Sequence, residues 1–243
     1  MTTPQFPSPP PNAAALASPR PRTWPRWTLP ALVVLGALAY WVDLPLAQLL
    51  HRETPPHIDD LFEDIGDLAN TDLFVVGALL VYGGSLWRLR GDKAGRFLGI
   101  GYDRWVRGSL LVIATMAIGG IVTLLLKQLV ARARPEVFFE NGFYGLGLPF
   151  SGDPFNSFPS SHTLTAFALA AALAHLLPRL RWPLFLFAAA VGISRLVNLD
   201  HYLSDVVTAA IVGIVAAGWL APRVLDPQRD WAARLPWRWR RKD

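Results

Sequence analysis

The sequence lacks cysteine entirely and is poor in charge, with only 17% Asp, Glu, Lys and Arg. Without cysteine, a disulfide-stapled domain and a zinc site built on thiolates are both excluded. Soluble domains average roughly 25% charged residues, whereas this chain of 243 residues is 52% apolar with a mean hydropathy of +0.31. A disordered chain is also excluded, because it would combine low hydrophobicity with high net charge. The composition therefore indicates an integral membrane protein.

Six apolar segments approach the roughly 20 residues that a bilayer span requires. They cover residues 29–44, 73–87, 108–126, 163–177, 182–199 and 202–221. The alternative for each segment is a buried helix of a soluble core. We predict an all-α fold, a bundle of six transmembrane helices with short interfacial helices. One interfacial helix is expected at residues 58–69, where apolar residues recur at helical spacing and five acids fill the opposite face.

The first apolar segment raises the question of a cleaved signal peptide. Ala37-Leu38-Ala39 has the small-x-small pattern of a cleavage site. However, the apolar run continues beyond this site through residues 40–42, and the stretch before the run is long for a signal peptide. We therefore predict that the segment is retained as a span.

Basic residues are distributed unevenly between alternate connections of the six spans. The termini and the loops on their side hold 18 of the 23 Lys and Arg residues, and the other side holds 13 of the 18 acids. Positive charge concentrates on the cytoplasmic side of membrane proteins, so both termini are predicted to be cytoplasmic. The net charge of +5 then reflects topology and an anionic inner leaflet, and no nucleic-acid partner is needed.

The same pattern divides the chain into three parts. Residues 1–27 are Pro-rich and predict a cytoplasmic tail, residues 28–222 form the six-span domain, and residues 223–243 form a basic cytoplasmic tail. The tryptophans among the basic residues of the last tail are typical of an interfacial anchor, although a solvated basic tail is almost as consistent.

Basic residues on the outer side are exceptions to the charge pattern and are therefore candidates for function. Lys127 ends the third span and Arg134 follows seven residues later, so on a continuous helix both would project from one face toward an anion. Pro135 disfavours further helix. We interpret Arg132, between these two, as a lipid-headgroup contact or a residue that supports the site.

Two histidines lie at the outer ends of later spans. His162 follows Ser160 and Ser161 where the fourth span begins, and a serine there predicts an N-cap beside a helix N-terminus that can bind an anion. His201 precedes Asp205 by four residues, so on a helix the two would face each other. Pairing would offset the cost of a carboxylate at the start of an apolar span. A purely structural pair is the alternative.

These residues together resemble a known family. Lys127-x6-Arg134-Pro135, Pro159-Ser160-Ser161-His162 and Ser194-Arg195-x5-His201-x3-Asp205 are similar to the three-part signature of the type 2 phosphatidic acid phosphatases (PAP2), which share their site with vanadium haloperoxidases. The match favours the membrane lipid phosphatase branch. One position departs from the family pattern, because Ser161 stands where Gly is usual.

The resemblance implies roles for the residues that match. His201 would attack phosphorus, Asp205 would orient it, and His162 would protonate the leaving oxygen. The phosphate would be held by the remaining matched residues, Lys127, Arg134, Ser160, Ser161 and Arg195. No acidic cluster lies near them, so neither a metal nor another cofactor is expected. Asp200 is interpreted as a turn former, and His51, His57 and His175 match no motif.

The resulting prediction is a phosphatase acting on a phosphorylated lipid at the periplasmic face of a bacterial inner membrane. Undecaprenyl diphosphate, phosphatidate, phosphatidylglycerophosphate and lipid A phosphate remain open as substrates, and the oligomeric state is not indicated. The alternatives are a vanadate-dependent haloperoxidase and a lipid-binding or transport protein without catalysis.

Overall fold

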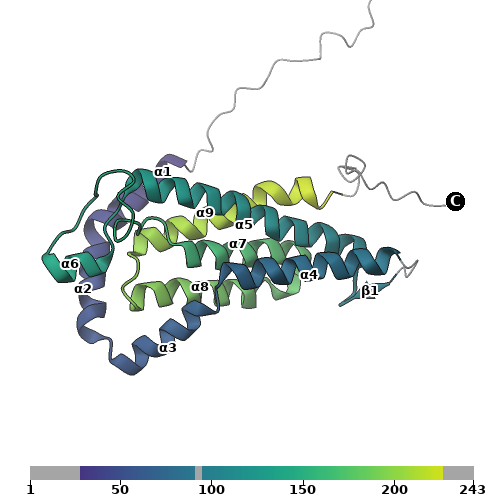
Figure 1. The fold of residues 1–243 in the computed structure, drawn as a ribbon, viewed down its shortest axis with the longest axis horizontal. Coiled ribbons are helices and arrows are strands. Elements are labelled where there is room, and N and C mark those ends of the chain that lie inside the picture. Colours follow the sequence, from purple (N-terminus) through teal and green to yellow (C-terminus); the bar gives the residue numbers. More distant parts are fainter. Residues whose placement is uncertain (1–27, 91–94, 227–243) are drawn as a thin grey trace, which may run out of the picture. The chain divides into compact units, whose positions relative to one another are not determined.

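The computed structural model describes residues 28–90 and 95–226. The predicted Pro-rich tail and nearly all of the predicted basic tail lie outside the described residues. Contacts divide the chain after Val34. The part from Leu35 onward, which carries every site residue discussed below, is described by itself (Figure 1).

The described chain is almost entirely helical. Its helices are α1 (Thr28–Ala37), a π-helical turn η2 (Leu38–Val42), α2 (Asp43–Glu53), α3 (Pro56–Asp67), α4 (Thr71–Arg90), α5 (Tyr102–Val130), α6 (Pro135–Asn141), α7 (Ser161–Leu176), a 3-10 turn η3 (Pro178–Leu180), α8 (Arg181–Val197) and α9 (Leu203–Val224). Strands β1 (Arg96–Phe97) and β2 (Ile100–Gly101) pair antiparallel between α4 and α5. The predicted helical class is confirmed, with this hairpin as a minor addition.

Five helical stretches are long and apolar enough to cross a membrane: Thr28–Glu53, Pro56–Leu89, Tyr102–Val130, Pro178–Val197 and Leu203–Val224. The predicted fourth span corresponds to α7, which has 16 residues. At 1.5 Å per residue α7 is about 24 Å long, shorter than the roughly 30 Å hydrocarbon core. It packs against α5, α8 and α9, so protein rather than lipid surrounds much of it (Figure 1). The predicted helical membrane bundle is thus confirmed, with a short sixth helix inside it.

Small residues let α7 and α9 approach each other closely. Ala166, Ala168 and Ala170 of α7 are buried. On α9, a Cβ atom added at Gly213 would lie 2.9 Å from the backbone nitrogen of Ala168. Small residues at helix contacts are the usual solution inside membranes, where close packing replaces the hydrophobic effect. This packing fixes the starts of α7 and α9, which carry His162 and Asp205.

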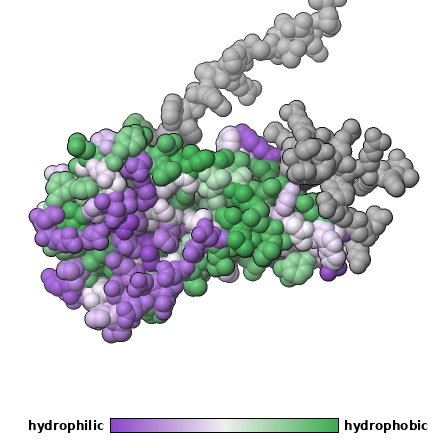
Figure 2. All heavy atoms as spheres, in the orientation of Figure 1, coloured by the Kyte–Doolittle hydropathy of each residue, from purple (hydrophilic) through white to green (hydrophobic). Residues whose placement is uncertain are grey.

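Polar and apolar side chains separate along the surface. In Figure 2, hydrophilic residues gather over α2, α3 and α6, whereas hydrophobic residues cover the long helices. Large apolar side chains on these helices are exposed, including Leu80, Ile121, Leu124 and Leu186. Such a face suits lipid. The predicted interfacial helix is observed as α3, whose Phe62 and Ile65 are half-buried while its acids are exposed.

One local expectation about the connection between the third and fourth predicted spans is wrong. Pro135 does not end helical structure but begins α6, because proline at the first position of a helix lacks only an N–H that would have no intrahelical partner. The connection between the third and fourth predicted spans therefore contains a helix before its irregular part.

Candidate active site

The predicted arrangement of Lys127 and Arg134 on one helix face is wrong. Helix α5 ends at Val130, and Ala131 takes the left-handed conformation with φ 46°. The chain then runs extended, with the N–H of Ala133 donating to the carbonyl of Gly145 at 3.1 Å. The N–H of Arg134 donates to the carbonyl of Pro154 at 3.1 Å. These bonds to two parts of the following loop replace helical bonds, which explains why the helix stops.

Lys127 and Arg134 nevertheless meet, at Asn156. The ammonium of Lys127 donates to the backbone carbonyl of Asn156, and Nε of Arg134 donates to its Oδ1 atom at 2.7 Å. Asn156 carries no sequence signal, because it belongs to an irregular loop whose course is set by long-range hydrogen bonds. It joins the two cations more directly than a shared helix face would.

Arg195 joins this group through Asp200. Its Nη1 atom lies 2.8 Å from Asp200 Oδ2, and Nη1 of Arg134 lies 3.8 Å from Asp200 Oδ1. Asp200 therefore contacts the cations of two motifs, a role that its interpretation as a turn former did not include. Helix α3 covers Arg195 from outside, since a Cβ atom at Gly66 would lie 1.5 Å from its Nη2 atom.

The start of α7 matches the predicted N-cap. Ser160 is fully buried, and its Oγ atom accepts a hydrogen bond from the hydroxyl of Thr163 at 3.0 Å. The N–H of Ser160 donates to the carbonyl of Asp205 at 3.4 Å, which ties the second motif to the third. Ser161 is exposed and His162 is half-buried in the first turn.

His201 and Asp205 do not share a helix, contrary to the prediction, because α9 begins at Leu203. Leu199, in the connection before His201, takes the left-handed conformation with φ 55°. The connection still brings the pair together, with His201 Nδ1 3.9 Å from Asp205 Oδ2. His201 is 5% exposed. Burial, followed by the positive charges of Lys127 and Arg134, lowers the pKa of His201 well below its ordinary value, so its imidazole is neutral at neutral pH.

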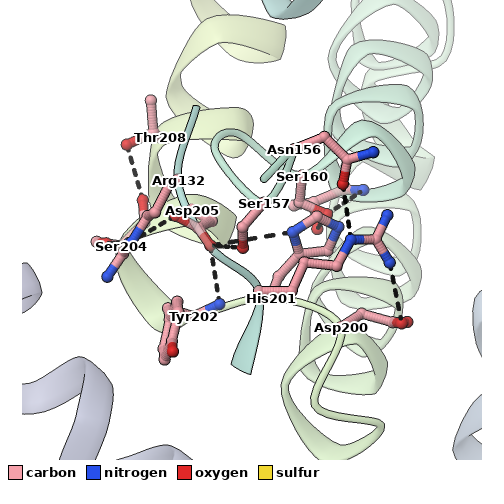
Figure 3. A network of polar contacts seen from close by, with 12 residues as sticks. Arg132, Asn156, Ser157, Ser160, Asp200, His201, Tyr202, Ser204, Asp205 and Thr208 are labelled. Carbon is pink, nitrogen blue, oxygen red and sulfur yellow. Dashed lines mark hydrogen bonds and ion pairs between the residues drawn. The ribbon is translucent and has the colours of Figure 1, made fainter. Parts of the chain in front are cut away.

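Asp205 obtains its main charge partner elsewhere than predicted (Figure 3). It is fully buried, and its Oδ1 atom lies 2.6 Å from Nη1 of Arg132. Its Oδ2 atom accepts hydrogen bonds from the hydroxyl of Ser157 at 2.6 Å and the N–H of Tyr202 at 2.9 Å. The cost of burying this carboxylate is therefore offset chiefly by Arg132, and His201 adds a longer contact.

Arg132 supports the site and is not placed to contact a lipid headgroup. Its side chain is only 8% exposed, and its Nη2 atom lies 2.8 Å from Asp43 Oδ2. Although burial opposes its charge, Asp205 and Asp43 raise the pKa of Arg132 above its ordinary value. Sequence reasoning missed Asp43 because a residue 89 positions away gives no local signal. Among the unmatched histidines, His51 stacks on Phe139 with ring centroids 4.0 Å apart.

Comparisons with known proteins show the family to which the chain belongs. The family model of the PAP2 superfamily matches residues 108–228. The chain is 30% identical to the lipid A 1-phosphatase of Rhizobium etli over 202 residues, which are 81% of this chain and 82% of that protein. It is 32% identical to the undecaprenyl-diphosphatase BcrC of Bacillus subtilis over 111 residues, 45% of this chain and 55% of that one.

A solved structure shares the fold. The transmembrane PAP2-type phosphatidylglycerolphosphate phosphatase of Bacillus subtilis superimposes with a TM-score of 0.61 at 18% identity, covering 83% of this chain and 96% of that one. The chain belongs to the PAP2 superfamily, as its three motifs indicated, and it is a multi-pass membrane protein.

Proposed function

We propose that this protein is a lipid phosphatase, which hydrolyses a phosphate monoester or diphosphate of a lipid at the periplasmic face of a bacterial inner membrane. The observation that carries the proposal is the meeting of three distant segments. Lys127, Arg134 and Arg195 gather around Asn156 and Asp200. The charges of all three cations act on His201, which is buried beside Asp205. A basic cluster beside a neutral histidine suits phosphoryl transfer, which depends mostly on positioning and charge stabilisation.

The first step would form a bond between His201 and phosphorus. The Nδ1 atom of His201 faces Asp205, so Nε2 is the nitrogen available to attack. As the N–P bond forms, the P–O bond to the lipid breaks, and His162 gives a proton to the leaving oxygen. Asp205 would stabilise the positive charge that develops on the imidazole.

The second step would release phosphate. His162, now deprotonated, takes a proton from a water molecule whose oxygen attacks phosphorus. The N–P bond then breaks, inorganic phosphate leaves, and His201 returns to its neutral form. The proton that His162 gives to the leaving oxygen in the first step is thus replaced by the proton that it takes from water in the second step.

The phosphoryl oxygens would be held by the three cations and by the start of α7. Ser160 accepts the capping bond through its oxygen, which leaves its own hydrogen free to donate. Ser161 keeps the backbone N–H that contacts an anion at a helix N-terminus, and its exposed side chain points away from the buried core. We propose no metal and no organic cofactor, because side-chain cations supply the positive charge that a metal would otherwise provide.

For the substrate, we propose a phosphorylated glycolipid of the lipid A type. The similarity to a lipid A 1-phosphatase extends over four fifths of both chains, whereas the similarity to the undecaprenyl-diphosphatase covers about half of each. The apolar faces of the long helices suit acyl chains while the headgroup reaches the cations.

A phosphate-release assay tests the function. The purified protein in detergent should release inorganic phosphate from lipid A fastest among lipid A, phosphatidylglycerophosphate, phosphatidate and undecaprenyl diphosphate. Activity should survive EDTA and should fall by roughly 10³-fold or more in His201→Ala. Quenching in alkaline SDS with ³²P-labelled substrate should trap a phosphoprotein, stable in base and labile in acid, in the wild type but not in His201→Ala. Loss of activity in EDTA with recovery in Mg²⁺, or full activity in His201→Ala, would contradict the proposal.

A further inference from the structure

Arg132 lies between two carboxylates that come from opposite parts of the chain. Its Nη1 atom is 2.6 Å from Asp205 Oδ1, and its Nη2 atom is 2.8 Å from Asp43 Oδ2. Asp205 begins α9, whereas Asp43 begins α2 and matches none of the three motifs. Asp43 and Asp205 are 1% and 0% exposed, so both charges are withdrawn from water.

Asp43 is held in place as firmly as Asp205. Its Oδ1 atom accepts the N–H of Ser204 at 2.9 Å, and its Oδ2 atom also accepts the hydroxyl of that serine. The rings of Tyr202 and Tyr144 lie 4.3 Å and 5.6 Å from the guanidinium carbon of Arg132 and close the remaining sides of the cation. Asp43 is therefore a fixed part of the layer directly behind Asp205 (Figure 3 shows its arginine and serine partners).

The charges in this layer do not balance. Two carboxylates share one guanidinium, so one net negative charge remains, and in a buried site such a charge is weakly screened. If Asp43 were neutral, Arg132 would neutralise Asp205 alone, and less negative charge would face His201. Asp43 therefore takes up part of the positive charge of Arg132, so that Arg132 does not fully neutralise Asp205.

We propose that Asp43 is a positioning residue for catalysis, which shares the charge of Arg132 so that Asp205 stays fixed and retains the negative charge that stabilises the His201 cation during attack. This inference rests on the proposed function, because it assigns a role relative to His201 as the nucleophile. It also makes the end of the first span part of the catalytic unit.

The charges that face His201 determine in which direction the pH profile of kcat/KM should move when Asp43 loses its charge. Lys127, Arg134 and Arg195 favour its neutral form, and Asp205 favours its cation. Attack requires neutral His201, so kcat/KM falls on the acid side as His201 takes up a proton. Removing the charge of Asp43 makes this environment more positive, which moves that acid limb to lower pH.

The test compares pH profiles of kcat/KM in detergent with a soluble aryl phosphate. Asp43→Asn should move the acid limb down by about half a pH unit and lower kcat, with KM little changed. Ser204→Ala removes a hydroxyl that contacts Arg132 and Asp43, but removes no charge, and should leave the limb in place. The double variant Asp43→Asn with Arg132→Gln removes one charge of each sign, so its limb should return to the wild-type position or lie above it.

An unshifted limb in Asp43→Asn, or the same downward shift in Ser204→Ala, would overturn the proposal and leave Asp43 a purely structural residue. If Asp43→Asn does not fold, the double variant Asp43→Asn with Arg132→Gln is used instead. An acid limb at or above the wild-type pH supports the proposal, and an acid limb below the wild-type pH contradicts it. A wild type with no phosphatase activity would instead refute the proposed function itself.

Discussion

The two histidines of the candidate site have different surroundings, and this difference predicts different mutant phenotypes. His201 is buried beside Asp205, whereas His162 is half-buried at the start of α7. His201→Ala should lower kcat by roughly 10³-fold or more, because the proposed covalent step would be lost. His162→Ala should slow poor leaving groups most, since a weakly basic leaving oxygen needs little protonation.

Steady-state kinetics with a p-nitrophenyl ester and an alkyl ester separate the two roles. The p-nitrophenyl ester should partly restore turnover in His162→Ala and should not do so in His201→Ala. Equal restoration in both variants would mean that the roles of nucleophile and acid are assigned wrongly.

Asp200 places a negative charge where the cations of two motifs meet. Its carboxylate contacts Arg195 at 2.8 Å and Arg134 at 3.8 Å, so a bound phosphate has to share these cations with it. Asp200→Asn keeps the shape and removes the charge. Because partly exposed pairs are worth up to about 1 kcal/mol, we expect orthovanadate, a phosphate analogue, to inhibit the variant about two- to fivefold more tightly.

Asp153 provides a matched control, because its carboxylate lies 3.7 Å from Nε of the same Arg134 but is 70% exposed. Asp153→Asn should change the inhibition constant less than Asp200→Asn does. An unchanged or weaker vanadate inhibition in Asp200→Asn would show that its carboxylate does not compete with the ligand.

At the residue scale, sequence reasoning predicted the proximity of residues that share a short motif. The spacing of His201 and Asp205 predicted their proximity, although the helix that was to carry both begins only at Leu203. The contacts of Arg132 with Asp205 and with Asp43 were not predicted, because they join residues 73 and 89 positions apart in the chain. Periodicity and spacing report only on neighbours along the sequence.

At the element scale, helix α3 forms a wall of the candidate site. Gly66 is the point of closest approach, since an added Cβ atom would lie 1.5 Å from Nη2 of Arg195. The clash would fall on the end of a flexible side chain, so the guanidinium can move without much loss of stability. Gly66→Ala should therefore raise KM about tenfold, as expected for loss of one charged phosphate contact, while the melting temperature in detergent changes little.

Gly83→Ala in α4 is the matched control, because a Cβ atom there would meet nothing within 4 Å. It should leave both KM and the melting temperature near the wild-type values. A wild-type KM in Gly66→Ala would indicate that Arg195 does not bind substrate in the observed orientation.

Element positions were predictable because apolar runs and punctuating residues are local features. The positions of the interfacial helix and of the spans along the chain were anticipated, although helix α5 (Tyr102–Val130) extends beyond the predicted third span at both ends. The end of α5 was not, since Ala131 adopts its left-handed turn only when the loop around Gly145 and Pro154 supplies hydrogen bonds to residues 133 and 134. The effect of Pro135 could not be predicted from the sequence either, because a proline is compatible both with the end of one helix and with the start of another.

At the scale of the whole molecule, the charge pattern and the surface agree with one orientation. Hydrophilic side chains gather at the α2, α3 and α6 end of the bundle, where the candidate site also lies (Figures 1 and 2). The end of α7 and the start of α8 lie away from the site, and Arg179 in η3 and Arg181 at the start of α8 are found there. Positive charge marks the cytoplasmic side, so the site is expected to face the periplasm.

The absence of cysteine allows this orientation to be mapped directly, because any cysteine introduced is the only thiol in the chain. Ser151, in the connection before α7, and Arg179, in η3, are both exposed. Ser151→Cys should react with a membrane-impermeant maleimide in intact spheroplasts, because its loop is predicted to be periplasmic. Arg179→Cys should react only after the membrane is broken, and a permeant maleimide should label both. The reverse labelling pattern would place the candidate site in the cytoplasm, where a periplasmic lipid headgroup could not reach it.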